Sequence, residues 1–139
     1  MTEDEFKYLH ILIIDDEAFM RKLIERTLGD IGIGIISQAA NGREGLSLLQ
    51  SAKSKVDLVI CDLEMPEMNG FDFVKQVRNS TDERFDSEVP ILILTGHADE
   101  ETVRGAANLG INGYLVKPIS RKSLEGRILK SIKTSAAKN

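Results

Sequence analysis

Short, nearly continuous runs of Ile, Leu and Val are the feature that most constrains the fold of this 139-residue chain. Such runs lie at 11–14, 58–61 and 91–94, each followed by a polar residue, and amphipathic segments separate them. Strands with uninterrupted apolar sequence are covered on both faces, which is typical of parallel sheets with helices on either side. The sequence therefore predicts a single-domain α/β fold built from alternating strands and helices.

Five strands alternate with five helices in the predicted pattern. The strands are expected at about 9–14, 35–39, 58–61, 91–94 and 113–116, and the helices at about 17–29, 43–52, 71–78, 99–108 and from 120 onward. We expect Gly29 to end the first helix and Ser120 to cap the last one. The strand at 35–39 has the weakest pattern, and the tail at 134–139 is expected to be frayed.

Composition disfavours several classes of protein. Hydrophobic residues make up 42% of the chain and charged residues 29%, which is ordinary for a globular protein, and the net charge of -4 argues against a nucleic-acid binder. The single cysteine, Cys61, lies in an apolar run, so we expect a buried, inert thiol. No apolar run approaches the roughly 20 residues of a membrane span, and the N-terminus has no secretory signal. We therefore expect a cytoplasmic protein with no nucleic-acid or membrane partner.

The polar residues that follow the predicted strands carry the functional signal. Asp15-Asp16 follows the first strand, Asp62 the third, Thr95 the fourth and Lys117 the fifth. In open parallel sheets, ligands bind in the crevice beyond the carboxyl ends of the strands. Acids, a hydroxyl and an ammonium group at one such edge indicate a site for a divalent cation and a phosphoryl group.

The chemistry of these groups suggests a role for each. Crowded carboxylates repel one another, and a hard divalent cation such as Mg²⁺ relieves that repulsion. Asp62 stands alone between the acid pair and the other two groups, so it is the candidate nucleophile for an aspartyl phosphate. Thr95 and Lys117 would contact phosphoryl oxygens, and the Lys117-Pro118 bond is a candidate cis peptide that would hold the lysine over the site. Taken singly, Thr95 is more simply a helix-capping hydroxyl and Lys117 a solvated lysine, so the hypothesis rests on the whole set.

In these motifs the chain resembles the receiver domains of two-component response regulators, and in plan the stand-alone, chemotaxis-Y-like members. The likeness covers about residues 9–132 and rests on Asp15-Asp16, Asp62, Met65-Pro66, Asn69-Gly70, Thr95, Tyr114 and Lys117-Pro118. It implies a doubly wound, flavodoxin-like sheet of five parallel strands in the order 2-1-3-4-5. We accordingly expect one receiver domain over residues 1–139, with its core at about 9–133 and no output domain.

The resemblance also implies a phosphorelay role. Asp62 would accept a phosphoryl group from a phosphohistidine on a sensor histidine kinase or a histidine phosphotransfer protein. A Mg²⁺ ion would be held by Asp16 and Asp62 directly, by Asp15 through water, and by the backbone carbonyl of Glu64. The protein would carry out self-phosphorylation and self-dephosphorylation chemistry only, and would not be a classical enzyme.

The same resemblance implies a switch. Tyr114 matches the aromatic position that swings inward when Thr95 moves toward the phosphoryl group. The surface made by the helix at 99–108, the strand at 113–116 and the last helix would then change shape for an unidentified downstream protein. We expect a monomer or a weak, phosphorylation-dependent dimer.

Two residues near the site lie at positions that the family pattern leaves variable. Glu64 could reach the water shell of the metal, or pair with Lys117 when no phosphoryl group is present, and its charge should repel that group. His97 could tune hydrolysis or be an exposed bystander. The lifetime of the phosphorylated form therefore stays open, as do the cognate kinase and the pathway.

Three alternatives are kept beside this interpretation. Asp62-Leu63-Glu64 resembles the Asp-x-Asp loop of haloacid dehalogenase-type phosphatases, which suggests a Mg²⁺-dependent phosphohydrolase with an aspartyl nucleophile, although the second acid is Glu. A degenerate receiver that serves only as an interaction scaffold is another. A dinucleotide-binding fold is disfavoured, because Gly32-Ile33-Gly34 precedes the second strand and the third glycine is missing.

Overall fold

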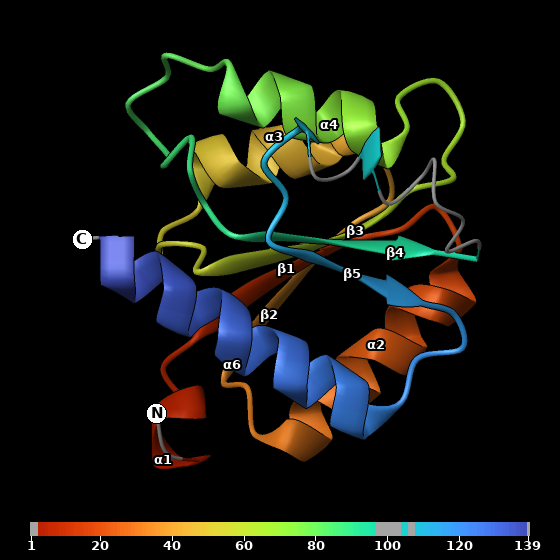
Figure 1. Cartoon of the computed structure of the whole chain (residues 1–139), viewed down its shortest axis with the longest axis vertical. Coiled ribbons are helices and arrows are strands. Elements are labelled where there is room, and N and C mark those ends of the chain that lie inside the picture. The colour runs from red at the N-terminus through yellow and green to blue at the C-terminus, as the bar shows by residue number, and fades with distance from the viewer. Residues whose placement is uncertain (1–2, 97–103, 106–107, 139) are drawn as a thin grey trace.

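One five-stranded sheet organises the computed structural model, which describes residues 3–96, 104–105 and 108–138 (Figure 1). The strands are β1 (His10–Ile14), β2 (Ile35–Ala39), β3 (Leu58–Asp62), β4 (Ile91–Thr95) and β5 (Gly113–Val116). Every neighbouring pair is parallel, and the order is β2-β1-β3-β4-β5. The predicted fold class and strand order are confirmed.

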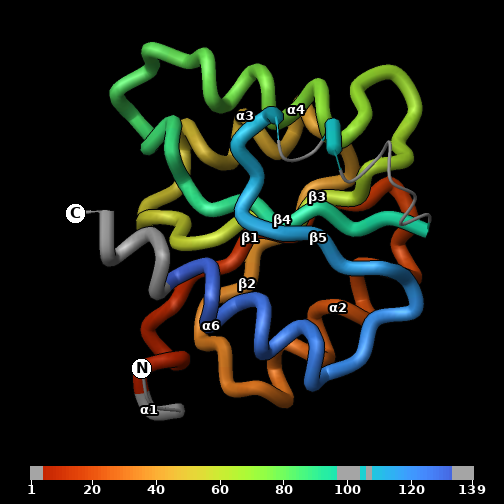
Figure 2. The backbone as a smooth tube through the Cα atoms, in the orientation of Figure 1, coloured from red at the N-terminus to blue at the C-terminus, as the bar shows by residue number. Residues whose placement is uncertain are grey.

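Helices cover both faces of the sheet. They are α1 (Glu3–Phe6), α2 (Ala18–Ile31), α3 (Gly42–Ser51), α4 (Gly70–Arg78) and α6 (Arg121–Lys138). In Figures 1 and 2, α2 and α6 lie on one face and α3 and α4 on the other. The helix expected at 99–108 falls largely outside the described residues. Among the described helices, none is both long enough and apolar enough to cross a bilayer.

The core consists of two apolar layers, one on each face of the sheet. Side chains alternate between the faces, as they do in any strand, so each central strand serves both layers. The layer beneath α2 and α6 contains Ile11, Ile13, Ile24, Leu28, Leu58, Ile60, Leu92, Leu94, Leu124 and Ile128. The layer beneath α3 and α4 contains Leu12, Ile14, Leu49, Val59, Cys61, Phe73, Val74, Val77, Ile91 and Ile93. Full burial of each such side chain contributes about 1.5–3 kcal/mol relative to exposure. Burial of these side chains therefore holds the strands in place, and with them the positions of their carboxyl ends.

Cys61 lies in the second layer and is fully buried. Burial raises the pKa of its thiol, because a thiolate would lose its solvation there. A buried thiol of this kind is chemically inert. The predicted burial of Cys61 is confirmed.

One predicted helix end is wrong. Gly29 lies inside α2, which ends at Ile31 and is capped by Gly32, where φ is 108° and the backbone N–H bonds back to the carbonyls of Gly29 and Leu28. Only the second glycine takes the left-handed conformation that ends a helix, and the buried Ile31 anchors the turn before it. At the end of the chain, α6 extends through Lys138.

The segment Gly32-Ile33-Gly34 has a structural explanation. Gly32 caps α2, and a Cβ atom on Gly34 would lie 1.8 Å from the carbonyl oxygen of Lys7. Both glycines are therefore required by the backbone alone. They lie before β2 rather than after β1, where a dinucleotide-binding loop would begin.

Candidate functional site

The carboxyl ends of the strands bring the predicted site residues together. Asp15 directly follows β1, Asp62 ends β3 and Thr95 ends β4, while Lys117 directly follows β5. One carboxylate oxygen each from Asp15, Asp16 and Asp62 lie within 4.8 Å of one another. The parallel register thus assembles one acidic cluster from segments that are nearly 50 residues apart in the chain.

Asp15 is a buried member of this cluster, and one of its carboxylate oxygens is unsatisfied within the described part of the chain. It is completely buried, and its Oδ1 atom accepts a hydrogen bond of 2.8 Å from the backbone N–H of Glu17. Its Oδ2 atom is also buried, with no hydrogen-bond partner among the described residues. Burial raises the pKa of Asp15 to about 6, and the nearby Asp62 carboxylate acts in the same direction. A buried carboxylate oxygen without a donor is costly, and a bound cation would satisfy it.

Asp62 is paired with Lys117. The Lys117 ammonium donates to Asp62 Oδ1 at 3.0 Å, and Asp62 is only 1% exposed. Burial raises the pKa of Asp62 even though Lys117 acts against it. Burial alone would lower the pKa of Lys117, but its hydrogen bond to Asp62 and the charges of Asp62, Asp15 and Glu64 raise it overall. Both shifts favour the protonated form: burial is the main cause for Asp62, and the surrounding carboxylates are the cause for Lys117.

Lys117 is held by its own backbone as well. Its N–H donates to the carbonyl oxygen of Thr95 at 2.9 Å, and the peptide bond to Pro118 is cis. The side chain is 19% exposed, so it lies at the boundary between the site and solvent. An ammonium group in this position can neutralise charge on a group that enters from outside.

Thr95 makes a contact that was not predicted. Its hydroxyl donates a hydrogen bond of 3.0 Å to Glu64 Oε1, from a position that is 1% exposed. Sequence reasoning allowed Glu64 to pair with Lys117, but in the structure Lys117 bonds Asp62 instead. That choice depends on side-chain rotamers in the loop after β3, which residue order does not specify.

The loop between β3 and α4 is fixed by backbone contacts. The N–H of Leu63 bonds the carbonyl of Leu94, and the N–H of Gly70 bonds the carbonyl of Leu63. A Cβ atom on Gly70 would lie 2.7 Å from the carbonyl oxygen of Asp62, so only glycine fits there. Asn69 begins α4 with a capping box. The Asn69-Gly70 pair therefore positions the backbone behind Asp62.

Arg21 is a site-adjacent residue that sequence reasoning missed. Its guanidinium donates to the backbone carbonyl of Asp15 at 2.6 Å. Arginine in the first turn of a helix opposes the helix dipole, and that unfavourable placement was the available signal. Arg21 ties α2 to the loop that carries the acid pair.

The remaining predicted residues lie at the rim or beyond the described part of the chain. Asp16 is exposed, whereas its neighbour is buried. Tyr114 is partly buried on β5, with the Arg127 guanidinium 5.6 Å from its ring centroid. His97 lies outside the described residues.

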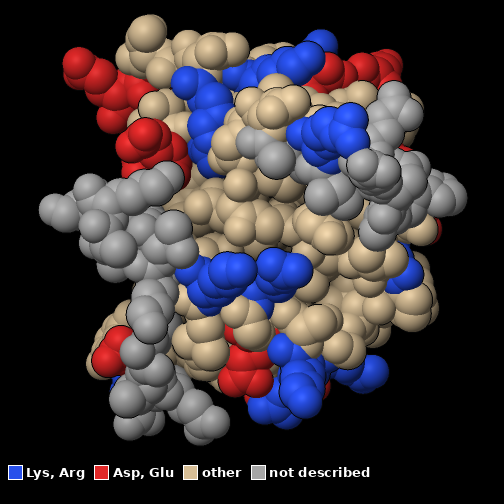
Figure 3. Space-filling model, viewed as in Figure 1, with Lys and Arg blue, Asp and Glu red and all other residues tan. Residues whose placement is uncertain are grey.

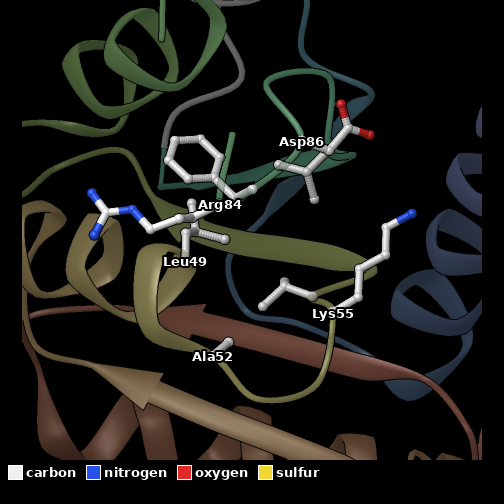
Figure 4. A pocket seen from close by; sticks show the side chains of 8 residues that line it. Leu49, Ala52, Lys55, Arg84 and Asp86 are labelled. Atoms are coloured by element: carbon white, nitrogen blue, oxygen red, sulfur yellow. The ribbon is translucent and has the colours of Figure 1, made fainter. Parts of the chain in front are cut away.

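A separate cavity lies at the opposite edge of the sheet. Its lining includes Val56 and Val89, which come just before β3 and β4, together with the residues labelled in Figure 4. Arg84 and Lys55 point away from each other there, and Arg84 pairs with Asp82 at 2.7 Å. This cavity contains no part of the acidic cluster.

Comparisons with known proteins agree with this geometry. The family model for the response regulator receiver domain matches residues 11–129, and the chain belongs to that family. Chemotaxis protein CheY-3 of Vibrio cholerae serotype O1 is 36% identical over 122 residues, which cover 88% of this chain and 90% of that protein. The predicted resemblance to receiver domains is confirmed.

Solved structures give the same result for the fold. The chemotaxis protein CheY4 of Vibrio cholerae has a TM-score of 0.77 and 35% identity, over 88% of this chain and 98% of that one. A response regulator receiver domain protein from Clostridium thermocellum has a TM-score of 0.81 and 29% identity, over 94% and 99%. The protein is thus a CheY-like receiver domain of two-component signalling, a class of phosphoryl-accepting modules rather than classical enzymes.

Proposed function

We propose that this protein is a phosphorylation-controlled binding module that accepts a phosphoryl group on Asp62. One observation carries the proposal: the buried Asp62 carboxylate lies 3.0 Å from the Lys117 ammonium, and a carboxylate oxygen of Asp62 lies within 4.8 Å of oxygens from two further acids. Membership of the receiver family supports it. The donor is a phosphohistidine on a sensor histidine kinase or a histidine phosphotransfer protein.

The transfer step uses groups that the site contains. A carboxylate oxygen of Asp62 attacks phosphorus, and the new O–P bond forms as the N–P bond of the phosphohistidine breaks. The imidazole leaves with the electron pair of that bond and takes up a proton. Lys117 neutralises one phosphoryl oxygen, and the Thr95 hydroxyl donates to another.

The acidic cluster fits a Mg²⁺ ion. Asp15, Asp16 and Asp62, with the backbone carbonyl of Glu64, would hold it, and the buried Oδ2 atom of Asp15 lacks any other partner among the described residues. All are oxygen ligands, which Mg²⁺ prefers. When bound, the ion supplies positive charge beside the transferring phosphoryl group. Burial raises the pKa of Asp15, and a cation beside it would favour the ionised carboxylate.

The output of the module is a change in the shape of the β5–α6 surface. Movement of Thr95 toward the phosphoryl group makes room for Tyr114, which lies on the neighbouring strand and contacts Arg127 of α6. The β5–α6 surface then takes a second shape, and a downstream protein that prefers this shape shifts the population toward it. A degenerate scaffold would need neither the cluster nor the lysine pair, and a phosphohydrolase would turn over small phosphate esters continuously.

Substitution of the phosphoacceptor tests the proposal. Wild-type protein treated with acetyl phosphate and Mg²⁺ should gain the mass of one phosphoryl group, and Asp62→Asn should gain none, because an amide is not a nucleophile of this kind. Glu67→Gln is the matched control, since Glu67 is an exposed acid in the same loop. Equal labelling of wild type and Asp62→Asn would contradict the proposal.

A further inference from the structure

Both groups that would bind a phosphoryl oxygen already have partners within the site. Lys117 bonds Asp62, and the Thr95 hydroxyl bonds Glu64. The bond from Lys117 to Asp62 already places the ammonium beside the phosphorylated residue, because the phosphoryl group is added to Asp62 itself. The bond from Thr95 to Glu64 must break before Thr95 can contact the phosphoryl group, because Glu64 carries no phosphoryl group.

We propose that Glu64 is a positioning residue that competes with the phosphoryl group for the hydroxyl proton of Thr95. This inference rests on the proposed function. It adds a hydrogen bond, from Thr95 to Glu64, that opposes phosphoryl binding, and we call this bond the brake. In the resting site, the Glu64 carboxylate holds the switch threonine. In the phosphorylated site, Glu64 must release Thr95 before Thr95 can bond a phosphoryl oxygen.

The competition follows from the chemistry of the two side chains. A hydroxyl has one proton to donate, and a carboxylate can only accept, so Thr95 gives that proton to Glu64 Oε1 at 3.0 Å. A phosphoryl oxygen is also only an acceptor and needs the same proton. Thr95 is 1% exposed, so water has little access to its hydroxyl.

Charge makes the two acceptors mutually exclusive. A carboxylate beside a phosphoryl group is repelled by it, so phosphorylation disfavours the position of the Glu64 side chain beside Thr95. Residue Glu64 is exposed and lies in a loop, so its side chain can turn into solvent without disturbing the core. The brake therefore acts through Thr95, and its release couples the state of Asp62 to the position of the switch threonine.

The expected size of the brake is that of one hydrogen bond to a charged group. Loss of that bond should raise the affinity of the Mg²⁺-loaded protein for beryllofluoride, a phosphoryl mimic, by roughly tenfold. Binding of a partner that prefers the phosphorylated shape should improve with it, because the competent state is more populated.

A double-mutant cycle separates this brake from simple charge repulsion. The affinity for beryllofluoride with Mg²⁺ is measured for wild type, Glu64→Ala, Glu64→Gln, Thr95→Val and the Glu64→Ala/Thr95→Val pair. A fluorotyrosine at position 114 in a Tyr8→Phe background reports binding by ¹⁹F NMR, since these are the two tyrosines. Glu67→Gln, which removes an exposed acid from the same loop, is the control for charge alone.

The brake predicts three results. Glu64→Ala gains roughly tenfold in affinity, Glu64→Gln gains less because its amide oxygen still accepts from Thr95, and the gain from Glu64→Ala disappears in the Thr95→Val background. Equal gains in both backgrounds, or equal gains for the alanine and glutamine variants, would overturn the brake while leaving phosphorylation of wild type intact. Failure of wild type to bind beryllofluoride at all would instead contradict the proposed function, and the brake with it.

Discussion

At the scale of single residues, the site is a balance between burial and charge. Asp15 and Asp62 are both buried, yet only Asp62 has an ammonium partner. Burial makes the Asp15 carboxyl group bind its proton more tightly than in water, with a pKa of about 6, and it raises the pKa of Asp62 as well. The site is therefore least stable electrostatically when Asp15 is ionised and no cation is bound.

Stability against pH tests this balance. The pKa of Asp15 is about 6 in the folded chain, above its ordinary value of 3.8. The contribution of the protonated acid to the free energy of unfolding is therefore fully present below about pH 3.8 and is lost as pH rises through about 6. Asp15→Asn mimics the protonated acid, so without metal it should stabilise the protein at about pH 7 by on the order of 2 kcal/mol and change little at about pH 4. Urea unfolding in the presence of a chelator measures the change in the free energy of unfolding at each pH. An equal effect at the two pH values would show that ionisation of Asp15 is not the cause.

Site features that are set by the backbone position of a residue could be predicted, and those that are set by side-chain conformation could not. Asp62, Thr95 and Lys117 could be placed at one edge of the sheet because strand ends are readable in the sequence, and parallel strands end at one edge. The bond from Thr95 to Glu64 and the bond from Arg21 to Asp15 were missed. Both depend on how long side chains turn in space, for which the residue order gives no periodic signal.

At the scale of elements, the strands and most helix ends were predictable, and the end of α2 was not. The bounds of β2 and β5 agree with the prediction, and β1, β3 and β4 differ by one residue at one end. Continuous apolar sequence identifies a buried strand, whereas several residues can end a helix and packing decides among them. The turn of helix at α1 was missed because it is four residues long and has no periodic pattern, although Phe6 in it is buried.

Two glycines in different elements should respond oppositely to alanine. Gly70→Ala places a methyl group 2.7 Å from the carbonyl oxygen of Asp62, so it should destabilise the fold by about 1–3 kcal/mol and weaken phosphorylation. Gly126 lies within α6 with nothing within 4 Å of its added Cβ, so Gly126→Ala should stabilise by about 0.5–1 kcal/mol. Urea unfolding compares the two. A neutral Gly70→Ala would show that the loop behind Asp62 relaxes freely.

At the scale of the whole molecule, the proposed chemistry and the proposed output surface occupy different parts of one sheet. The acidic cluster lies at the carboxyl edge, and the adjacent β5–α6 surface carries Tyr114 and Arg127. Figure 3 shows Lys and Arg side chains gathered along the middle of α6, on a chain whose net charge is -4. In the proposed switch, a shift of Thr95 at the end of β4 would reach this surface through the paired strand β5.

The central claim is that Asp62 becomes an acyl phosphate, and chemical trapping tests it most directly. Protein treated with acetyl phosphate and Mg²⁺ is reduced with borohydride, which converts an aspartyl phosphate to homoserine, and peptides are sequenced by mass spectrometry. The account predicts homoserine at position 62 and at no other carboxylate. Reduction at a different acid, or at none while the protein is phosphorylated, would contradict it.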